Sequence, residues 1–167
     1  MTAIAYRDGV LAVDSQCTWG SMKTHTKKYQ IVDVCNIGIC VVVMSGNVHA
    51  SEHVVDWIMK NDYGRDTPFE ELQSNARYGF AITEDLIVYP IFGNGYIGHP
   101  DTNKFVAEGC AFEFLHGAMA AGEGAFQAVE LATIYCDGCS GPVIKIDVKK
   151  EIQKMYIPAA YKDQDSY

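Results

Sequence analysis

Strand-type segments in this sequence come in adjacent pairs, and helical segments separate the pairs. The first pair, "TAIAYR" and "VLAVDS", flanks Asp8-Gly9, a dipeptide typical of tight β-hairpin turns. The second pair is "YQIVDV" with "NIGICVVVM", and the third is "ARYGFAIT" with "LIVYPIF". Strands grouped in this way, with helices between the groups, indicate an α+β fold built in layers rather than alternating βαβ units.

Two regions have the apolar periodicity of helices. The segment "GNVHASEHVVDWIMKND" predicts one amphipathic helix, and residues 110–136 predict two helices separated at Gly122–Gly124. We also expect a short helical turn near Thr67-Pro68, a strand at "KFVAEG" and a closing strand at "GPVIKIDVKK". Four small side chains would let the helix pair pack closely against a neighbouring layer: Ala120, Ala121, Ala125 and Ala128.

Length and charge restrict the class of protein. The 167 residues suit a single domain covering 1–167, with a loose tail from about residue 158. The net charge is −8, and no Lys/Arg cluster is longer than two residues, so we expect no binding to nucleic acid. No apolar run is long enough for a membrane span, and the first residues lack the pattern of a secretory signal. We therefore expect a cytoplasmic protein with no membrane association.

Cysteine and histidine patterns raise the question of a metal or redox site. The six cysteines include the C-x-x-C segment "CDGC" at 136–139, and "HASEH" at 49–53 has the H-x-x-E-H spacing of some zinc peptidases. A catalytic zinc also needs a third protein ligand, and none is evident. We expect reduced thiols, an exposed polar helix face at "HASEH", and neither a metal nor a cofactor.

Three segments, in this order, resemble the proteasome β-subunit and HslV-type peptidases, which are N-terminal-nucleophile hydrolases. They are "TAIAYRDGVLAVDS", then "KKYQI", then "FVAEGCAFEFLHGAMAAG" continuing through "AFQAVELA" to "DGCSGPVIKIDV". The resemblance covers roughly residues 2–148, and compact phage-encoded members are the most similar. It implies a four-layer αββα sandwich, the N-terminal-nucleophile hydrolase fold.

The resemblance also implies a catalytic set. Thr2 would be the nucleophile once Met1 is removed, with its own α-amine as the base. Lys28 would lie beside the Thr2 hydroxyl, Asp14 would hold Lys28, and the Gly46 N–H would stabilise the oxyanion. Lys27 is a competing candidate for the lysine.

The spacing of the first hairpin adds an independent argument for Asp14. A two-residue turn at Asp8-Gly9 places Ala3 opposite Asp14, within one position of Thr2. Strict alternation would point the Asp14 side chain away from the Thr2 face, so a bulge or a strand end must redirect it. The register therefore predicts proximity and leaves orientation open.

Further site residues come from the third segment. Asp137 and Ser140 match the family's D-x-x-S support for the terminal amine, although Pro142 replaces a glycine and a shifted register would put Cys139 in the serine position. Cys110 replaces the serine of the family's G-S-G turn. A thiol is a weaker hydrogen-bond donor than a hydroxyl, which argues against full activity.

The resemblance implies partners as well. We expect a homo-oligomeric ring of about six or seven subunits that cleaves peptides or unfolded proteins. The chain lacks a G-x-x-x-x-G-K-S/T loop, so a separate unfoldase ATPase would have to deliver folded substrates. The alternative is a non-catalytic descendant of the same fold that serves as a phage structural or protein-binding component.

Overall fold

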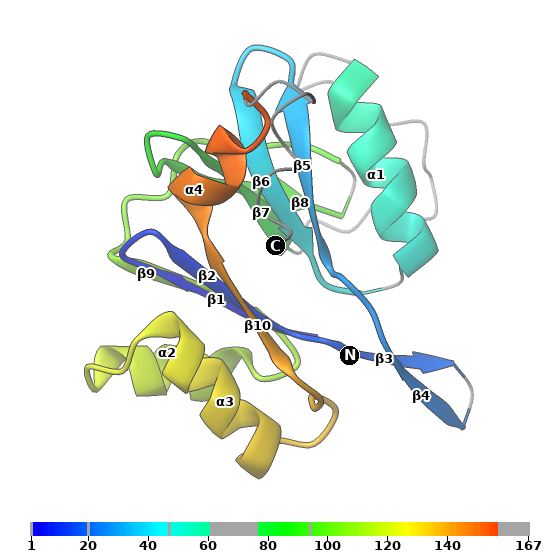
Figure 1. The fold of residues 1–167 in the computed structure, drawn as a ribbon, viewed down its shortest axis with the longest axis vertical. Helices are drawn as coiled ribbons and strands as arrows, with labels where there is room; N and C mark the ends of the chain where they lie inside the picture. Colours follow the sequence, from blue (N-terminus) through cyan, green and yellow to red (C-terminus); the bar gives the residue numbers. More distant parts are fainter. Residues whose placement is uncertain (1, 20, 47, 61–76, 94, 157–167) are drawn as a thin grey trace, which may run out of the picture.

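Two four-stranded sheets face each other, and helices cover their outer faces (Figure 1). The computed structural model describes residues 2–19, 21–46, 48–60, 77–93 and 95–156. The helical turn expected near residue 67 and the tail expected from about 158 lie outside the described residues.

The first sheet has the strand order β10-β2-β1-β9, and every neighbouring pair is antiparallel. Its strands are β1 (Ala3–Arg7), β2 (Val10–Asp14), β9 (Phe105–Gly109) and β10 (Val143–Asp147). The turn between β1 and β2 has positive φ at both Asp8 (51°) and Gly9 (81°), which is the backbone of a type I′ hairpin. Ile4 pairs with Val13, so the predicted register is confirmed.

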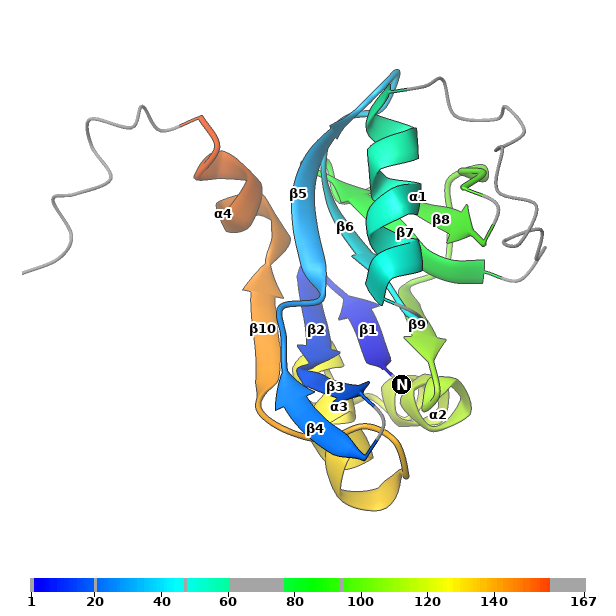
Figure 2. The ribbon, with the colours of Figure 1, turned by 90° about the vertical axis from the view of Figure 1, so that its right-hand side faces the viewer.

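The second sheet has the order β5-β6-β7-β8 and is also antiparallel throughout. Its strands are β5 (Tyr29–Val34), β6 (Gly38–Met44), β7 (Arg77–Thr83) and β8 (Val88–Phe92). Helix α1 (Val48–Lys60) covers its outer face, while α2 (Phe112–Ala120) and α3 (Ala125–Tyr135) cover the outer face of the first sheet (Figures 1 and 2). The layers therefore run helix, sheet, sheet, helix, as predicted.

Alternation along β1 explains how the layers assemble. Ile4 and Tyr6 point into the core between the two sheets, while Ala3 and Ala5 point toward α2 and α3. All four are buried, which is possible because a strand in the middle of a layered fold is covered on both faces. The small side chains on one face let the helix pair approach closely.

The alanines of the helix pair divide into two groups. Ala125 and Ala128 are buried against the first sheet, as expected. Ala120 and Ala121 lie at the solvent-exposed end of α2, so the prediction that they pack against a layer is wrong. The reason is the face of the helix, because Met119 in the same turn is buried against the first sheet while Ala120 and Ala121 are exposed.

Two elements were not predicted from the sequence. A small hairpin of β3 (Gln16–Trp19) and β4 (Met22–His25) projects from the sandwich beside the start of β1 (Figure 2). Helix α4 (Val148–Gln153) follows β10, so the predicted closing strand at "GPVIKIDVKK" ends at Asp147 and its last three residues are helical. The Asp147 carboxylate accepts a hydrogen bond from the Lys150 N–H at 3.2 Å and so caps α4, whose Val148 and Ile152 enter the core between the sheets.

Candidate active site

Thr2 lies immediately before β1 and is held by the turn that follows β9. Its carbonyl oxygen accepts a hydrogen bond from the Cys110 N–H at 2.9 Å and contacts the Cys110 thiol at 3.4 Å. Gly109 pairs with Ala3, and a Cβ at Gly109 would lie only 1.8 Å from the Thr2 oxygen. Only glycine lets the chain pass this close, and the Gly109 φ of +97° also favours glycine.

Asp14 and Lys28 form an ion pair next to Thr2. The Lys28 Nζ lies 2.9 Å from Asp14 Oδ1, and the lysine and aspartate side chains are 6% and 0% exposed. The same Oδ1 accepts a hydrogen bond from the Ala3 N–H at 2.7 Å. The end of β2 thus turns the carboxylate toward the beginning of β1, which answers the question of orientation that the register left open.

The structure also separates the two candidate lysines. The Lys27 ammonium lies over the ring of Tyr29, 4.1 Å from its centroid, while Lys28 binds Asp14. Asp14 Oδ2 is buried and has no hydrogen-bond partner among the described residues.

Gly46 lies in the turn between β6 and α1, at the end of the sandwich where β1 begins (Figures 1 and 2). Ser45 fixes this turn, since both its N–H and its hydroxyl donate to the Tyr78 carbonyl, at 2.7 and 2.9 Å. Gly46 has a φ of +94°, and a Cβ there would lie 3.2 Å from the Tyr78 ring. The turn therefore has a conformation that favours glycine, and the hydrogen bonds from Ser45 to the Tyr78 carbonyl hold its backbone in place.

The segment after α3 contributes unequally. The Ser140 hydroxyl hydrogen-bonds the side chain of Gln16, and the Gln16 N–H donates to the Ser140 carbonyl at 3.1 Å. Cys139 is buried, and its thiol contacts the Ala132 carbonyl at 3.3 Å. Asp137 is exposed. Ser140 is thus the polar residue of this segment, and the role of Asp137 stays a prediction.

Comparisons with known proteins agree with this architecture. No family model matches the sequence, and no curated protein matches it. Solved structures do match. A Gly-1 mutant of Anbu from Hyphomicrobium sp. strain MC1 aligns with a TM-score of 0.63 and 13% identity, over 86% of this chain and 79% of that chain.

Two further structures match over most of their length. BPH from Thiobacillus denitrificans, solved in complex with epoxomicin, has a TM-score of 0.58 and 17% identity, over 87% of this chain and 96% of that chain. HslV from Trypanosoma brucei has a TM-score of 0.55 and 16% identity, over 87% and 98%. The chain has the proteasome β-subunit fold. The expected similarity to phage-encoded members stays a prediction.

Within this proteasome-type fold, a polar cluster that the sequence does not predict lies behind Asp14. The buried Ser15 hydroxyl lies 3.2 Å from His25 Nδ1, and the Ser15 carbonyl accepts from the Thr26 N–H at 2.9 Å. A Cβ at Gly141 would lie 2.5 Å from the His25 ring and 2.9 Å from the Ser15 hydroxyl. These contacts join the β3–β4 hairpin to the 140–141 segment, and only the serine after Asp14 hints at them in the sequence.

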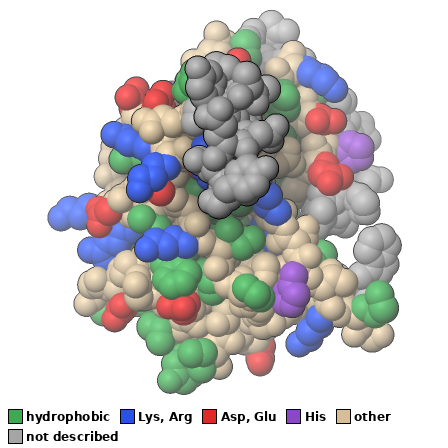
Figure 3. Space-filling model, in the orientation of Figure 1, with side chains coloured by type: hydrophobic (Ala, Val, Ile, Leu, Met, Phe, Trp, Pro, Cys, Tyr) green, Lys and Arg blue, Asp and Glu red, His purple; other side chains and the backbone are tan. Residues whose placement is uncertain are grey.

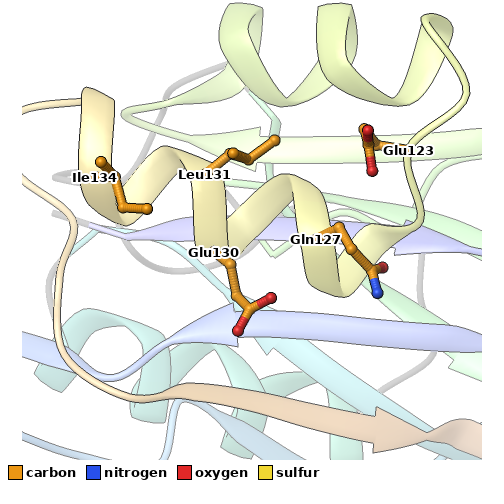
Figure 4. A pocket seen from close by; sticks show the side chains of 5 residues that line it. All are labelled: Glu123, Gln127, Glu130, Leu131 and Ile134. Atoms are coloured by element: carbon orange, nitrogen blue, oxygen red, sulfur yellow. The ribbon is translucent and has the colours of Figure 1, made fainter.

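The remaining features concern metal binding, membrane spans and a hollow on the surface. Among the described residues, no group of three or more His, Cys, Asp or Glu side chains could hold a metal ion. None of the described helices is long and apolar enough to cross a bilayer. A hollow of about 390 Å³ on the outer surface of α3 is lined by residues outside the site (Figure 4): Glu123, Gln127, Glu130, Leu131 and Ile134.

Proposed function

We propose that this protein is an N-terminal threonine peptidase, with Thr2 as the nucleophile once Met1 is removed. The observation that carries the proposal is the buried Asp14–Lys28 ion pair, which is bonded through Asp14 to the Ala3 N–H and so adjoins Thr2. Burying two charges has a high desolvation cost, so a buried ion pair often adds little net stability. Stability alone is therefore a weak reason for this pair to be buried. A buried ammonium beside a threonine at the chain start suits nucleophile activation.

The chemistry follows from the freed amine. A free α-amine titrates at about 7.7–8.0, and the positive charge of Lys28 nearby would lower the pKa of the amine further. The neutral amine takes the proton of the Thr2 hydroxyl, and the oxygen attacks the carbonyl carbon of the substrate. The carbonyl oxygen becomes an oxyanion, which the Gly46 N–H would stabilise.

The intermediate then collapses. The peptide C–N bond breaks, the leaving amine receives the proton held by the Thr2 amine, and an ester to Thr2 remains. Water attacks this ester, with the amine again as the base, and releases the acid and the free hydroxyl. Cys110 would support the reaction indirectly, because it binds the Thr2 carbonyl rather than the hydroxyl.

The deciding experiment is mass spectrometry of the purified protein before and after treatment with a peptide epoxyketone. We expect loss of Met1 and a covalent adduct on Thr2. Thr2→Ala should abolish the adduct and the peptidase activity, whereas Thr102→Ala, at an exposed position outside the site, should change neither. Thr2→Ser should keep some activity because it keeps the hydroxyl and the amine. A processed protein that gains no adduct would refute the proposal.

We further propose that the chain assembles into a homo-oligomeric ring and accepts peptides or unfolded proteins, with folded substrates supplied by a separate ATPase. Three large apolar side chains are exposed on the helix pair, namely Phe112, Ile134 and Tyr135. Hydrophobic side chains also gather over α2 and α3 on the face that Figure 3 shows. Subunit contacts would bury this surface. Light scattering that gave a monomer at micromolar concentration would contradict the ring.

Two observations favour a second candidate function. The exposed Asp137 lies outside the described hydrogen bonds of the site, and Cys110 stands where the family has serine. Both would suit a non-catalytic descendant that binds proteins or serves as a phage structural component. Retention of Met1 in protein from its native source would support this alternative, because an acylated Thr2 nitrogen is not a base.

A further inference from the structure

The first two residues of β7 bind two different turns of the candidate site. The Tyr78 carbonyl accepts hydrogen bonds from the N–H and the hydroxyl of Ser45, at 2.7 and 2.9 Å, and so holds the turn that carries Gly46. The side chain of Arg77 binds β9, which belongs to the other sheet. One dipeptide therefore connects the Gly46 turn with the strand whose end packs on the nucleophile.

The Arg77 guanidinium makes three contacts with β9 and the loop before it. Its Nε lies 2.6 Å from Glu108 Oε2, and its Nη2 donates to the Ala107 carbonyl at 2.9 Å. Its Nη1 lies 3.3 Å from Asp101 Oδ2. The three side chains are 25%, 14% and 12% exposed for Arg77, Glu108 and Asp101, so water screens their charges only in part.

Glu108 extends this contact to the nucleophile. Its second oxygen, Oε1, accepts a hydrogen bond from the Gly109 N–H at 3.3 Å. Gly109 passes directly against the Thr2 carbonyl, and the Cys110 N–H donates to that carbonyl at 2.9 Å. The path from Arg77 to the nucleophile therefore consists of Glu108 and the turn that follows it.

We propose that Arg77 is a positioning residue, which fixes the Thr2 hydroxyl and the Gly46 N–H relative to each other. It acts on one group through Glu108 and on the other through the backbone of β7. The nucleophile and the oxyanion donor act on the same substrate carbonyl, so their separation determines how well the transition state is stabilised. This consequence for catalysis rests on the proposed peptidase function, whereas the connection between the two turns does not.

The test replaces Arg77 and measures kcat and KM separately with a peptide substrate. Arg77→Met removes the guanidinium and keeps an unbranched side chain. We expect kcat to fall by on the order of tenfold to a hundredfold with KM nearly unchanged, because misplaced groups weaken binding of the transition state rather than of the substrate. Arg77→Lys should recover part of kcat, since an ammonium can still pair with Glu108. An unchanged kcat, or a rise in KM alone, would overturn the proposal.

Arg7→Met is the matched control. The Arg7 side chain is 26% exposed and also joins two layers, because it donates to the carbonyls of Met119 and Glu123 at 2.6 and 2.8 Å. It lies at the other end of β1 from the candidate site. Its loss should lower the melting temperature without changing kcat or KM. If kcat fell equally in Arg7→Met and Arg77→Met, a general loss of packing would explain the effect and the proposal would be wrong.

Glu108→Gln tests the path through the carboxylate. It keeps the shape of the side chain and removes the charge that pairs with Arg77, so kcat should fall, though less than in Arg77→Met. The double variant should have a kcat no lower than Arg77→Met alone, because the two changes break the same contact. Losses that multiply in the double variant would contradict the path. If Arg77→Met does not fold, an unchanged kcat in Glu108→Gln would still refute it.

Amide hydrogen exchange separates failure of this inference from failure of the peptidase function. The N–H groups of Ser45 and Cys110, one in each turn, should exchange faster in Arg77→Met than in the unmodified protein and should not change in Arg7→Met. If the unmodified protein cleaves no peptide, the peptidase function fails, and exchange at these two amides still decides whether Arg77 connects the turns. Unchanged exchange at both amides would show that it does not.

Discussion

Lys28 and Asp14 are joined across 2.9 Å at the junction of β1, β2 and β5, and both side chains are almost completely buried. Asp14 is the last residue of β2, Lys28 immediately precedes β5, and Asp14 also binds the backbone of Ala3. The ion pair therefore fixes three strand ends relative to one another. Because the first of those strands begins at Ala3, the pair also sets the position of Thr2.

The first prediction concerns the cost of breaking this pair. Lys28→Ala leaves Asp14 buried without its cation, so the free energy of unfolding should fall by about 3–5 kcal/mol. Peptidase activity should fall nearly as far as in Thr2→Ala, because residues that act as one unit are not additive. Urea denaturation and peptide hydrolysis measure the two effects.

The matched control for Lys28 is its neighbour. Lys27→Ala loses the contact with the Tyr29 ring, worth roughly 0.5–1 kcal/mol at an exposed site, and should keep its activity. If Lys27→Ala were the inactive variant and Lys28→Ala the active one, the assignment of the lysine would be wrong.

The second prediction concerns the passage of β1 beside β9. Gly109→Ala would push a Cβ into the Thr2 carbonyl and force a side chain into a positive-φ conformation. We expect lower stability, by at least the roughly 1–2 kcal/mol of the conformational strain, together with loss of Thr2 labelling. Thermal unfolding and epoxyketone labelling provide the measurements.

Gly117→Ala is the control for this substitution. Gly117 lies inside α2, and a Cβ there would meet nothing within 4 Å. The change should stabilise the protein by about 0.5–1 kcal/mol, because glycine is a poor helix former. Equal changes in stability and in Thr2 labelling for Gly109→Ala and Gly117→Ala would mean that the close approach of Gly109 to Thr2 has no importance.

Sequence reasoning reached the layered fold because its signals are local. The Asp8-Gly9 turn fixes the first hairpin, and alternation along β1 fixes which face meets which layer. The same register brought Asp14 beside Ala3. The orientation of the Asp14 carboxylate could not be predicted, because it depends on Lys28, which immediately precedes β5 of the other sheet.

The missed elements depend on tertiary contacts. Helix α4 is only six residues long, and it forms where Val148 and Ile152 can close the core between the sheets. Hairpin β3–β4 is mostly exposed, so no apolar alternation marks it, and the contact between His25 and Ser15 ties it to the rest of the chain. Short elements of this kind obtain their stability from packing rather than from local preference.

The third prediction separates backbone strain from catalysis at the turn after β6. Gly46→Ala and Gly38→Ala both place a side chain at nearly the same positive φ, +94° and +95°. Each should lose about 1–2 kcal/mol of stability from this strain. Only Gly46→Ala should lose peptidase activity, by on the order of a hundredfold if its N–H binds the oxyanion. Equal activity in the two variants would remove Gly46 from the proposed mechanism.

The last prediction concerns the attachment of α4 to β5. The Tyr29 hydroxyl donates a hydrogen bond to Glu151 at 3.0 Å, and burial, together with this carboxylate, raises the pKa of Tyr29 from 10.0 to about 12. The folded state therefore holds the phenol proton more tightly than the unfolded state does. Stability from this group is complete below pH 10 and is lost as the pH rises toward 12.

Tyr29→Phe isolates that contribution. Urea denaturation across this alkaline range should show a steeper fall in the free energy of unfolding for the unmodified protein than for Tyr29→Phe, because the variant has no proton to lose. The two curves should differ by a constant amount below pH 10 and converge above it. Parallel curves over the whole range would mean that the bond between Tyr29 and Glu151 does not hold α4 in solution.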